Sequence, residues 1–233
     1  MSEELSELLQ MSRTAREFCQ RFLLSCLSDS KRYTVNELFS VPLILITRII
    51  RSQEAIEFLL EKDYSAEAAV IALTQFELRL DILYIDTNVR RATQWIKHKS
   101  KVYHPWKVND KIDKVYGLDP KRRDAQHESF QMLSAVKHGN PLSGEFGFPV
   151  RMKGNKISGT TGQINDSLTL RYKVTICGFC VYQLLEALEG VSRTFSKFIN
   201  INNDLSQELA HLLQQSKEKM AQSMLRVGAI SNP

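Results

Sequence analysis

The sequence contains few of the residues that form turns between short strands. Only 10 glycines and 6 prolines occur among its 233 residues, and a large sheet protein normally needs more of both. We therefore expect long helices. Neither the glycine-rich P-loop pattern, nor GxGxxG, nor HExxH occurs. A nucleotide-hydrolysing enzyme of the usual kinds is therefore not expected.

Cysteine is also scarce, with four residues in the chain. Cys177 and Cys180 form a CxxC pair, but this pair lies inside an apolar helical run. A redox pair normally opens a helix after a strand, where the helix dipole lowers the thiol pKa. Cys19 and Cys26 belong to another helix, and no second CxxC completes a zinc site. We predict four buried cysteines, no metal and no cofactor.

Long hydrophobic runs are absent as well. The longest apolar stretches fall short of the roughly 20 residues that a membrane-spanning helix needs. The opening residues, MSEELSELLQ, are acidic and lack the basic start and apolar segment of a signal peptide. We therefore expect a cytoplasmic protein that does not enter a membrane.

Positive charge, in contrast, is concentrated in one stretch. Residues 90–123 contain eleven basic and three acidic residues, a net charge of +8, although the whole chain carries only +5. Both tryptophans and several histidines fall in or beside this stretch. Basic residues interleaved with aromatic ones are typical of RNA or single-strand binding, through phosphate pairing and base stacking. The candidate nucleic-acid-binding residues are Trp95, Lys97, Lys99, Lys101, Trp106 and Arg122.

A solvated basic face, with its aromatic rings turned into the core, is an equally reasonable interpretation of the same stretch, because tryptophan is more often buried than exposed.

Hydrophobic periodicity predicts an all-α protein, a single helical domain over residues 1–233 with seven to eight helices. We expect its core at residues 41–200 and one small β-hairpin around residues 148–160, with Gly154 and Asn155 in the turn. The first helix, 3–27, and the last, 204–227, would pack on this core or mediate oligomerisation. The last helix has an apolar seam that suits docking or self-association: Leu205, Leu209, Leu212, Leu213, Met220, Met224 and Leu225.

The helix predicted over residues 65–87 is apolar on all sides, which indicates a central position. It nevertheless contains Glu77, Arg79 and Asp81. Burying an unpaired charge is unfavourable, so these side chains must find partners on other helices. We expect all three to be structural buried charges.

The helix predicted over residues 120–138 has a polar stripe that contains histidine. At about 100° per residue, Arg123, His127, Ser134 and His138 fall within roughly 60° of each other. The apolar residues Ala125, Met132, Leu133 and Val136 lie on the opposite side. His138 is followed by Gly-Asn-Pro, which ends a helix, so capping alone explains a histidine there. The functional alternative is that this stripe carries proton-transfer groups.

Three segments resemble a bacterial helical family of unknown function that is distantly similar to the HEPN (higher eukaryote and prokaryote nucleotide-binding) superfamily. They are AEAAVIALTQFELRLDILYI, RRATQWIKH and SFQMLSAVKHGNP, and the resemblance covers about residues 41–149. It implies a helical bundle that acts as a homodimer. Many HEPN proteins are metal-independent ribonucleases of toxin–antitoxin and antiviral systems, with an Arg and a His at the dimer cleft.

The HEPN signature is an Arg, usually followed by a polar residue, and then a His, with four to six residues between the Arg and the His. Arg91 and His98 have six intervening residues, and Arg122 and His127 have four. His138 is the histidine that the family pattern places best, but Gln131, Met132 and Leu133 stand where its Arg is expected, so a degenerate, non-cutting bundle is the alternative.

If RNA is cleaved, His138 or His127 would accept the 2′-hydroxyl proton, and an Arg would neutralise charge on the phosphate. The candidate catalytic residues are Arg91, His98, Arg123, His127, Ser134 and His138.

The function that we expect is RNA binding, with metal-independent RNA cleavage as a further hypothesis. The resemblance adds a prokaryotic antiviral-defence or toxin–antitoxin setting, and a homodimer or a complex with another defence protein. One alternative is a non-catalytic helical subunit that docks onto a larger defence effector. Another is a small-ligand sensor that uses the charged core around Glu77.

Overall fold

The computed structural model describes residues 2–30, 37–88, 90–98, 105–138, 150–153, 156–159 and 167–230. Helix dominates these ranges, so the predicted all-α class is confirmed. Eight helices and two short strands follow one another along the described chain: α1 (Glu3–Ser30), α2 (Glu37–Glu61), α3 (Ser65–Thr87), α4 (Arg90–Lys97), α5 (Val108–Tyr116), α6 (Pro120–Lys137), β1 (Val150–Lys153), β2 (Lys156–Gly159), α7 (Ser167–Phe195) and α8 (Asn203–Ile230).

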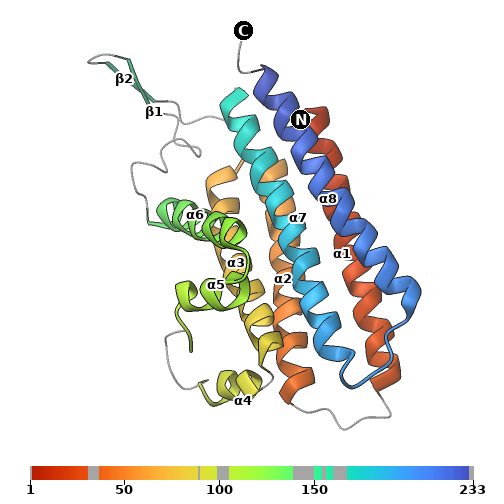
Figure 1. Cartoon of the computed structure of the whole chain (residues 1–233). Helices are drawn as coiled ribbons and strands as arrows, with labels where there is room; N and C mark the ends of the chain where they lie inside the picture. The colour runs from red at the N-terminus through yellow and green to blue at the C-terminus, as the bar shows by residue number, and fades with distance from the viewer. Residues whose placement is uncertain are drawn as a thin grey trace.

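Five long helices form the body of the molecule. Figure 1 shows α1, α2, α3, α7 and α8 side by side, with α4, α5 and α6 along one side of them. The helices α3 and α7 run parallel. Their contacts show this, since the residue numbers rise on both helices from one contact to the next: Phe76 stacks near Phe179, Arg79 pairs with Glu186, and Asp86 pairs with Arg193. This parallel pair places polar residues of both helices at matching heights in the interior.

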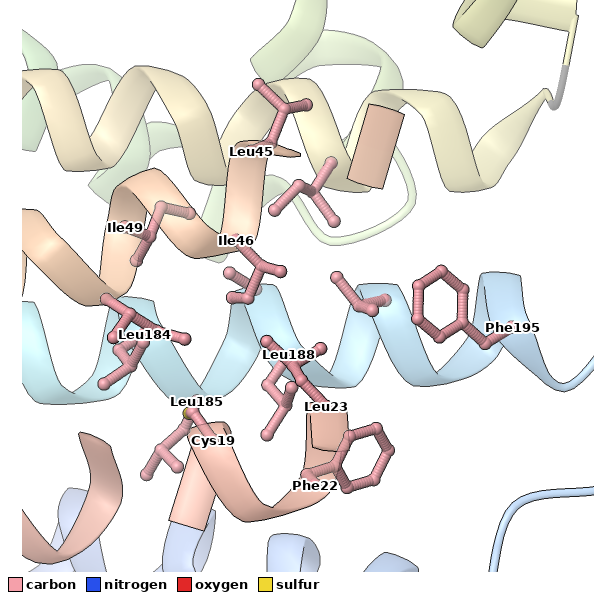
Figure 2. Packing of buried hydrophobic residues seen from close by; sticks show 14 of the residues in the cluster. Cys19, Phe22, Leu23, Leu45, Ile46, Ile49, Leu184, Leu185, Leu188 and Phe195 are labelled. Carbon is pink, nitrogen blue, oxygen red and sulfur yellow. The ribbon is translucent and has the colours of Figure 1, made fainter. Parts of the chain in front are cut away.

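The apolar core is built around α7. Leu184, Leu185 and Leu188 of this helix are fully buried, and Figure 2 shows them between side chains of α1 and α2. Farther along α7, Phe195 stacks on Phe39 with the ring centroids 4.1 Å apart. Each fully buried leucine contributes roughly 1.5–3 kcal/mol by leaving water, and α7 contacts the other four long helices, α1, α2, α3 and α8.

A tight turn joins α2 to α3. The backbone N–H of Tyr64 donates to the carbonyl of Leu59 at 2.8 Å, and that of Asp63 donates to Leu60 at 3.3 Å. This is a Schellman pattern, which needs a left-handed residue at its turn. Asp63 takes that role with φ of 65°, and its carboxylate pairs with Lys173 of α7. The turn thereby fixes the start of α3 against α7.

The terminal helices pack on the body of the molecule. On α8, Leu209 and Leu212 are buried in the same core cluster as α1 and α7. Met220 covers Gly178 of α7 so closely that a Cβ at Gly178 would lie 2.7 Å from the Met220 Cγ. Only Leu225 of the predicted apolar seam is largely exposed, at 75%. Most of the seam is therefore used within the chain.

The two short strands lie between α6 and α7 in the chain. They pair antiparallel, with Val150 opposite Gly159 and Lys153 opposite Lys156, and Figure 1 shows them projecting away from the helices. The turn predicted at Gly154 and Asn155 lies outside the described residues.

One helix is long and apolar enough to span a membrane by length and composition alone. It is the Leu170–Phe195 part of α7. In its most apolar window, 78% of the residues are buried inside the protein. The core helix of a soluble protein passes the same test.

Candidate nucleic-acid interface

The basic stretch forms a layer of three short helices. The helices α5 and α6 contact each other and α3, and α4 contacts α2 and α3. Lys97, Lys107, Lys114 and Lys121 are exposed on this layer. None of these four side chains forms an ion pair with another described residue. Lys99 and Lys101, two of the predicted nucleic-acid-binding residues, lie outside the described residues.

Other basic residues of the stretch turn inward. The Lys111 Nζ lies 2.6 Å from the Asp81 Oδ1, and both side chains are buried. Arg91 donates to the carbonyl oxygen of Tyr84 at 2.7 Å and to the Thr87 hydroxyl. It thus satisfies carbonyl groups at the C-terminal end of α3, where a cation is favourable. The charge available at the surface is therefore smaller than the sequence count of +8.

Both tryptophans pack against the core. Trp95 and Trp106 are half-buried and contact the apolar cluster around α7. The Trp106 ring also lies against Tyr84, with centroids 5.1 Å apart. Part of each ring remains accessible, but neither stands free of the fold as a stacking platform would. These contacts correspond to the second interpretation of the stretch, in which the rings turn toward the core.

The predicted polar stripe of α6 lies at the surface. Arg123 pairs with its neighbour Asp124 at 2.9 Å. The His127 Nε2 lies 2.9 Å from the Asp113 Oδ1 of α5, with 27% of its side chain exposed. Ser134 is half-buried, and His138 is exposed just after the last turn. The His138 backbone N–H donates to the Ser134 carbonyl oxygen at 3.1 Å, so this residue caps the helix through its main chain.

The apolar side of α6 differs from the prediction. Ala125 is exposed, and Met132 is 38% exposed. Gln126 is buried instead, and Phe130 packs on Phe76 with ring centroids 6.2 Å apart. The buried face is centred between Phe130 and Leu133 because the guanidinium of a buried arginine on α3 holds Gln126 inward.

The two members of the Arg122–His127 pair point in different directions. Arg122 faces α7, whereas His127 faces α5, because five residues along a helix turn the direction by about 140°. Arg91 is engaged at the end of α3. His98 follows α4, where its backbone N–H donates to the carbonyls of Gln94 and Trp95 at 3.2 Å.

A charged cluster lies in the interior where α3, α5, α6 and α7 meet. Arg79 is the largest fully buried side chain described. Its Nη1 donates to the Glu186 Oε2 of α7, and its Nη2 donates to the Gln126 Oε1. The Tyr116 hydroxyl donates to the Glu186 Oε1 at 3.1 Å. Arg122 also donates to Glu186, and it reaches the surface with 42% of its side chain exposed.

Aromatic rings enclose this cluster. The Arg79 guanidinium lies 4.7 Å from the Phe76 ring centroid, and that of Arg122 lies 4.9 Å from the Tyr116 centroid. Arg122 also donates to the Tyr182 hydroxyl at 2.6 Å. Burial, reinforced by the nearby Glu186 carboxylate, raises the pKa of Tyr182 to about 12. Burial likewise raises the pKa of Tyr116, so both hydroxyls stay protonated.

Glu77 does not share this burial. Arg79 and Asp81 are buried and pair across helices, but Glu77 is only half-buried. It lies on the side of α3 that carries the exposed Thr74. Because apolar residues also occur on this side of α3, the sequence pattern did not show that the side is partly exposed. The expectation of a buried Glu77 is therefore wrong.

Sequence reasoning missed the acid at the centre of the cluster. Glu186 is an acid flanked by apolar residues in VYQLLEALEG. This pattern predicts a buried ion pair, because an acidic residue in an apolar helical run needs a buried cation. Tyr116, Gln126 and Tyr182 gave no comparable signal, since each residue type is common on partly exposed helix faces.

The four cysteines are buried, and none forms a disulfide bond with another described residue. Burial raises the pKa of Cys19, Cys177 and Cys180, so these thiols lack the activated thiolate of a redox or nucleophilic site. Within the described ranges, no group of three or more His, Cys, Asp or Glu side chains is placed to hold a metal ion.

Comparison of the chain with protein-family models, with curated proteins and with solved structures finds no match.

Proposed function

We propose that this protein binds RNA through the layer formed by α4, α5 and α6. The observation that carries the proposal is the set of exposed lysines on this layer, Lys97, Lys107, Lys114 and Lys121. These ammonium groups make no ion pair with other described residues, so phosphate oxygens can reach them without displacing a carboxylate. Binding of this kind depends on phosphate charge and falls steeply as salt rises.

The second part of the proposal is metal-independent RNA cleavage by the histidine stripe of α6. A histidine can accept the 2′-hydroxyl proton, and a second cationic group can protonate the leaving oxygen. His127 and His138 are eleven residues apart, about 16 Å along the helix axis, so the two cannot act on one phosphate in one chain. A symmetric homodimer would bring the His138 of one protomer to the stripe of its partner.

The biological setting of the proposal rests on the resemblance of three segments to a HEPN-like bacterial family. That resemblance implies a protein of a prokaryotic antiviral-defence or toxin–antitoxin system that acts as a homodimer or in a complex with another defence protein. A non-catalytic docking subunit gains no support from α8, because Leu209 and Leu212 of its apolar seam are buried against the chain's own core.

The binding proposal is tested by charge reversal. The triple variant Lys107→Glu, Lys114→Glu, Lys121→Glu should weaken the binding of single-stranded RNA in fluorescence anisotropy. Losing three phosphate contacts should also make the slope of log K against log salt shallower by about 2. Lys107 and Lys121 lie at the starts of α5 and α6, where glutamate is favourable, so folding should be retained.

The matched control reverses three exposed arginines elsewhere, Arg48, Arg51 and Arg171, which form no ion pair with other described residues. It changes the net charge equally and should keep the wild-type salt slope. Equal weakening by both triple variants would show nonspecific attraction only. A wild-type chain that binds no RNA at low salt would end the proposal.

The cleavage proposal is tested separately with His138→Gln, and with His211→Gln on α8 as an exposed control. We expect His138→Gln to abolish RNA cleavage or toxicity while the melting temperature stays nearly constant, and the control to behave as wild type. A well-folded His138→Gln protein that still cleaves RNA would leave His138 as a helix cap and nothing more.

A further inference from the structure

A chain of polar side chains enters the helical bundle from the α1 side. Arg16 donates to the Glu57 Oε2 at 3.1 Å, and the Ser12 hydroxyl donates to the Glu57 Oε1. Gln53 Nε2 donates to the Ser12 hydroxyl oxygen at 2.7 Å. Gln75 Nε2 then donates to the Gln53 Oε1 at 2.9 Å. The chain thus passes from α1 through α2 to α3.

The charged cluster enters the interior from the opposite side. It begins at the partly exposed Arg122 and Tyr182 and continues through Glu186 to the fully buried Arg79. Gln75, where the first chain ends, lies one helical turn before Arg79 on α3. The two series of hydrogen-bonded side chains therefore end next to each other on α3, at Gln75 and at Arg79.

Gln183 of α7 lies between these two ends. Gln75 Nε2 donates to the Cys180 carbonyl oxygen at 2.7 Å, and Arg79 donates to Glu186. Cys180, Gln183 and Glu186 are spaced three residues apart, so they follow one ridge of α7. Because α3 and α7 run parallel, Gln183 is placed at the height between Gln75 and Arg79.

Four polar atoms at this junction are buried and accept or donate no hydrogen bond among the described residues: Gln75 Oε1, Arg79 Nε, Gln183 Oε1 and Gln183 Nε2. The three side chains are fully buried. More than about 90% of buried polar groups in proteins are paired, and leaving one unpaired costs about 1–3 kcal/mol. Four such atoms at one junction call for a partner.

We propose that this junction is a binding site for ordered water, holding one or two molecules between α3 and α7. The set contains two donors, Arg79 Nε and Gln183 Nε2, and two acceptors, Gln75 Oε1 and Gln183 Oε1. Its occupant must therefore both donate and accept hydrogen bonds, which excludes a simple anion or cation. Water does so and is small enough for an enclosed site, where it typically makes about three hydrogen bonds.

Such water joins the two polar chains into one network that crosses the bundle from Arg16 on α1 to Arg122 on α6. None of the exposed lysines of the α4–α6 layer belongs to this network, so the water site does not rest on the proposed RNA binding.

A high-resolution crystal structure of the full wild-type chain tests the site directly. We expect density for water within hydrogen-bond distance of the Gln183 amide and of the Arg79 Nε. Direct bonds from the Gln183 amide to Gln75 or Arg79, with nothing between them, would overturn the proposal. This test needs no variant, so it does not depend on how well a substituted protein folds.

Magnetic relaxation dispersion of water provides the solution test. The wild type should show long-lived internal water, and Gln183→Leu should lose part of that signal. Gln131→Leu, the same substitution at an exposed position of α6, should retain it. An identical signal in all three proteins would place the internal water elsewhere and refute the site.

Discussion

Replacing Glu186 with glutamine removes a buried negative charge and leaves the shape of the side chain almost unchanged. In the wild type, the carboxylate accepts from Arg79, Arg122 and Tyr116. After the substitution, the fully buried Arg79 guanidinium retains only neutral partners. We expect the variant to fold, because the amide can still accept hydrogen bonds, but with a much lower free energy of unfolding.

The size of the loss follows from which charges are buried. Breaking a buried pair by removing one partner costs about 3–5 kcal/mol. The part due to Arg122 is small, about 0–1 kcal/mol, because its side chain is 42% exposed. A chain of this size loses about 2–4 °C of melting temperature per kcal/mol. The expected decrease is therefore about 6–20 °C.

Urea denaturation followed by circular dichroism measures the loss. The matched control is Glu189→Gln on the same helix, where the carboxylate is 46% exposed and pairs with Arg193 at 3.1 Å. It should change the free energy of unfolding by about 0.5 kcal/mol or less. Arg79→Met combined with Glu186→Leu should recover much of the loss, since apolar replacement of a buried pair is often tolerated. If Glu186→Gln is no more destabilising than Glu189→Gln, the ion pair between Glu186 and Arg79 does not stabilise the fold as a buried pair, and the reasoning is refuted.

Two further predictions follow from the interior. Cys177 and Cys180 should resist modification by a thiol reagent in the native protein and react fully in urea, because burial raises their pKa; rapid labelling of the native chain would contradict their burial. The pKa of Tyr182 rises from 10.0 to about 12 on folding, so between these pH values the unfolded chain loses this proton while the folded chain keeps it. The free energy of unfolding should then fall as pH rises above 10, and less steeply in Tyr182→Phe; parallel curves for the two proteins would contradict the raised pKa.

Helix positions were accessible from the sequence because they depend on local periodicity. The start of α6 illustrates this. Asp119 accepts from the Arg122 backbone N–H at 3.0 Å, and Pro120 follows it in the first turn, as helix-start preferences predict. The start of α2 is less accessible. The helix begins at Glu37 and includes Pro42, although proline inside a helix is normally unfavourable.

Pairing between helices was not accessible, because it depends on residues far apart in the chain. Arg79 and Glu186 are 107 positions apart, and nothing local to Arg79 indicates which helix supplies its partner. A second contact of Arg79 involves α6. Gln126 turns inward to meet Arg79, and Met132 turns outward as a result. Hydrophobicity alone assigns Met132 to the core, so the error reflects a buried polar contact that overrides the apolar pattern.

Arg122 connects the interior to the proposed RNA surface, and its environment decides which residues are suited to bind phosphate. It matches the Arg of a HEPN-like Arg–His spacing, but its guanidinium is held by Glu186 and Tyr182. Phosphate binding by Arg122 would have to break a partly buried ion pair and leave Glu186 with Arg79 as its sole described cation. The exposed lysines carry no such penalty. On the proposed RNA surface, Lys107, Lys114 and Lys121 are therefore better suited to phosphate contact than Arg122, whose hydrogen bonds to Glu186 and Tyr182 link α6 to α7.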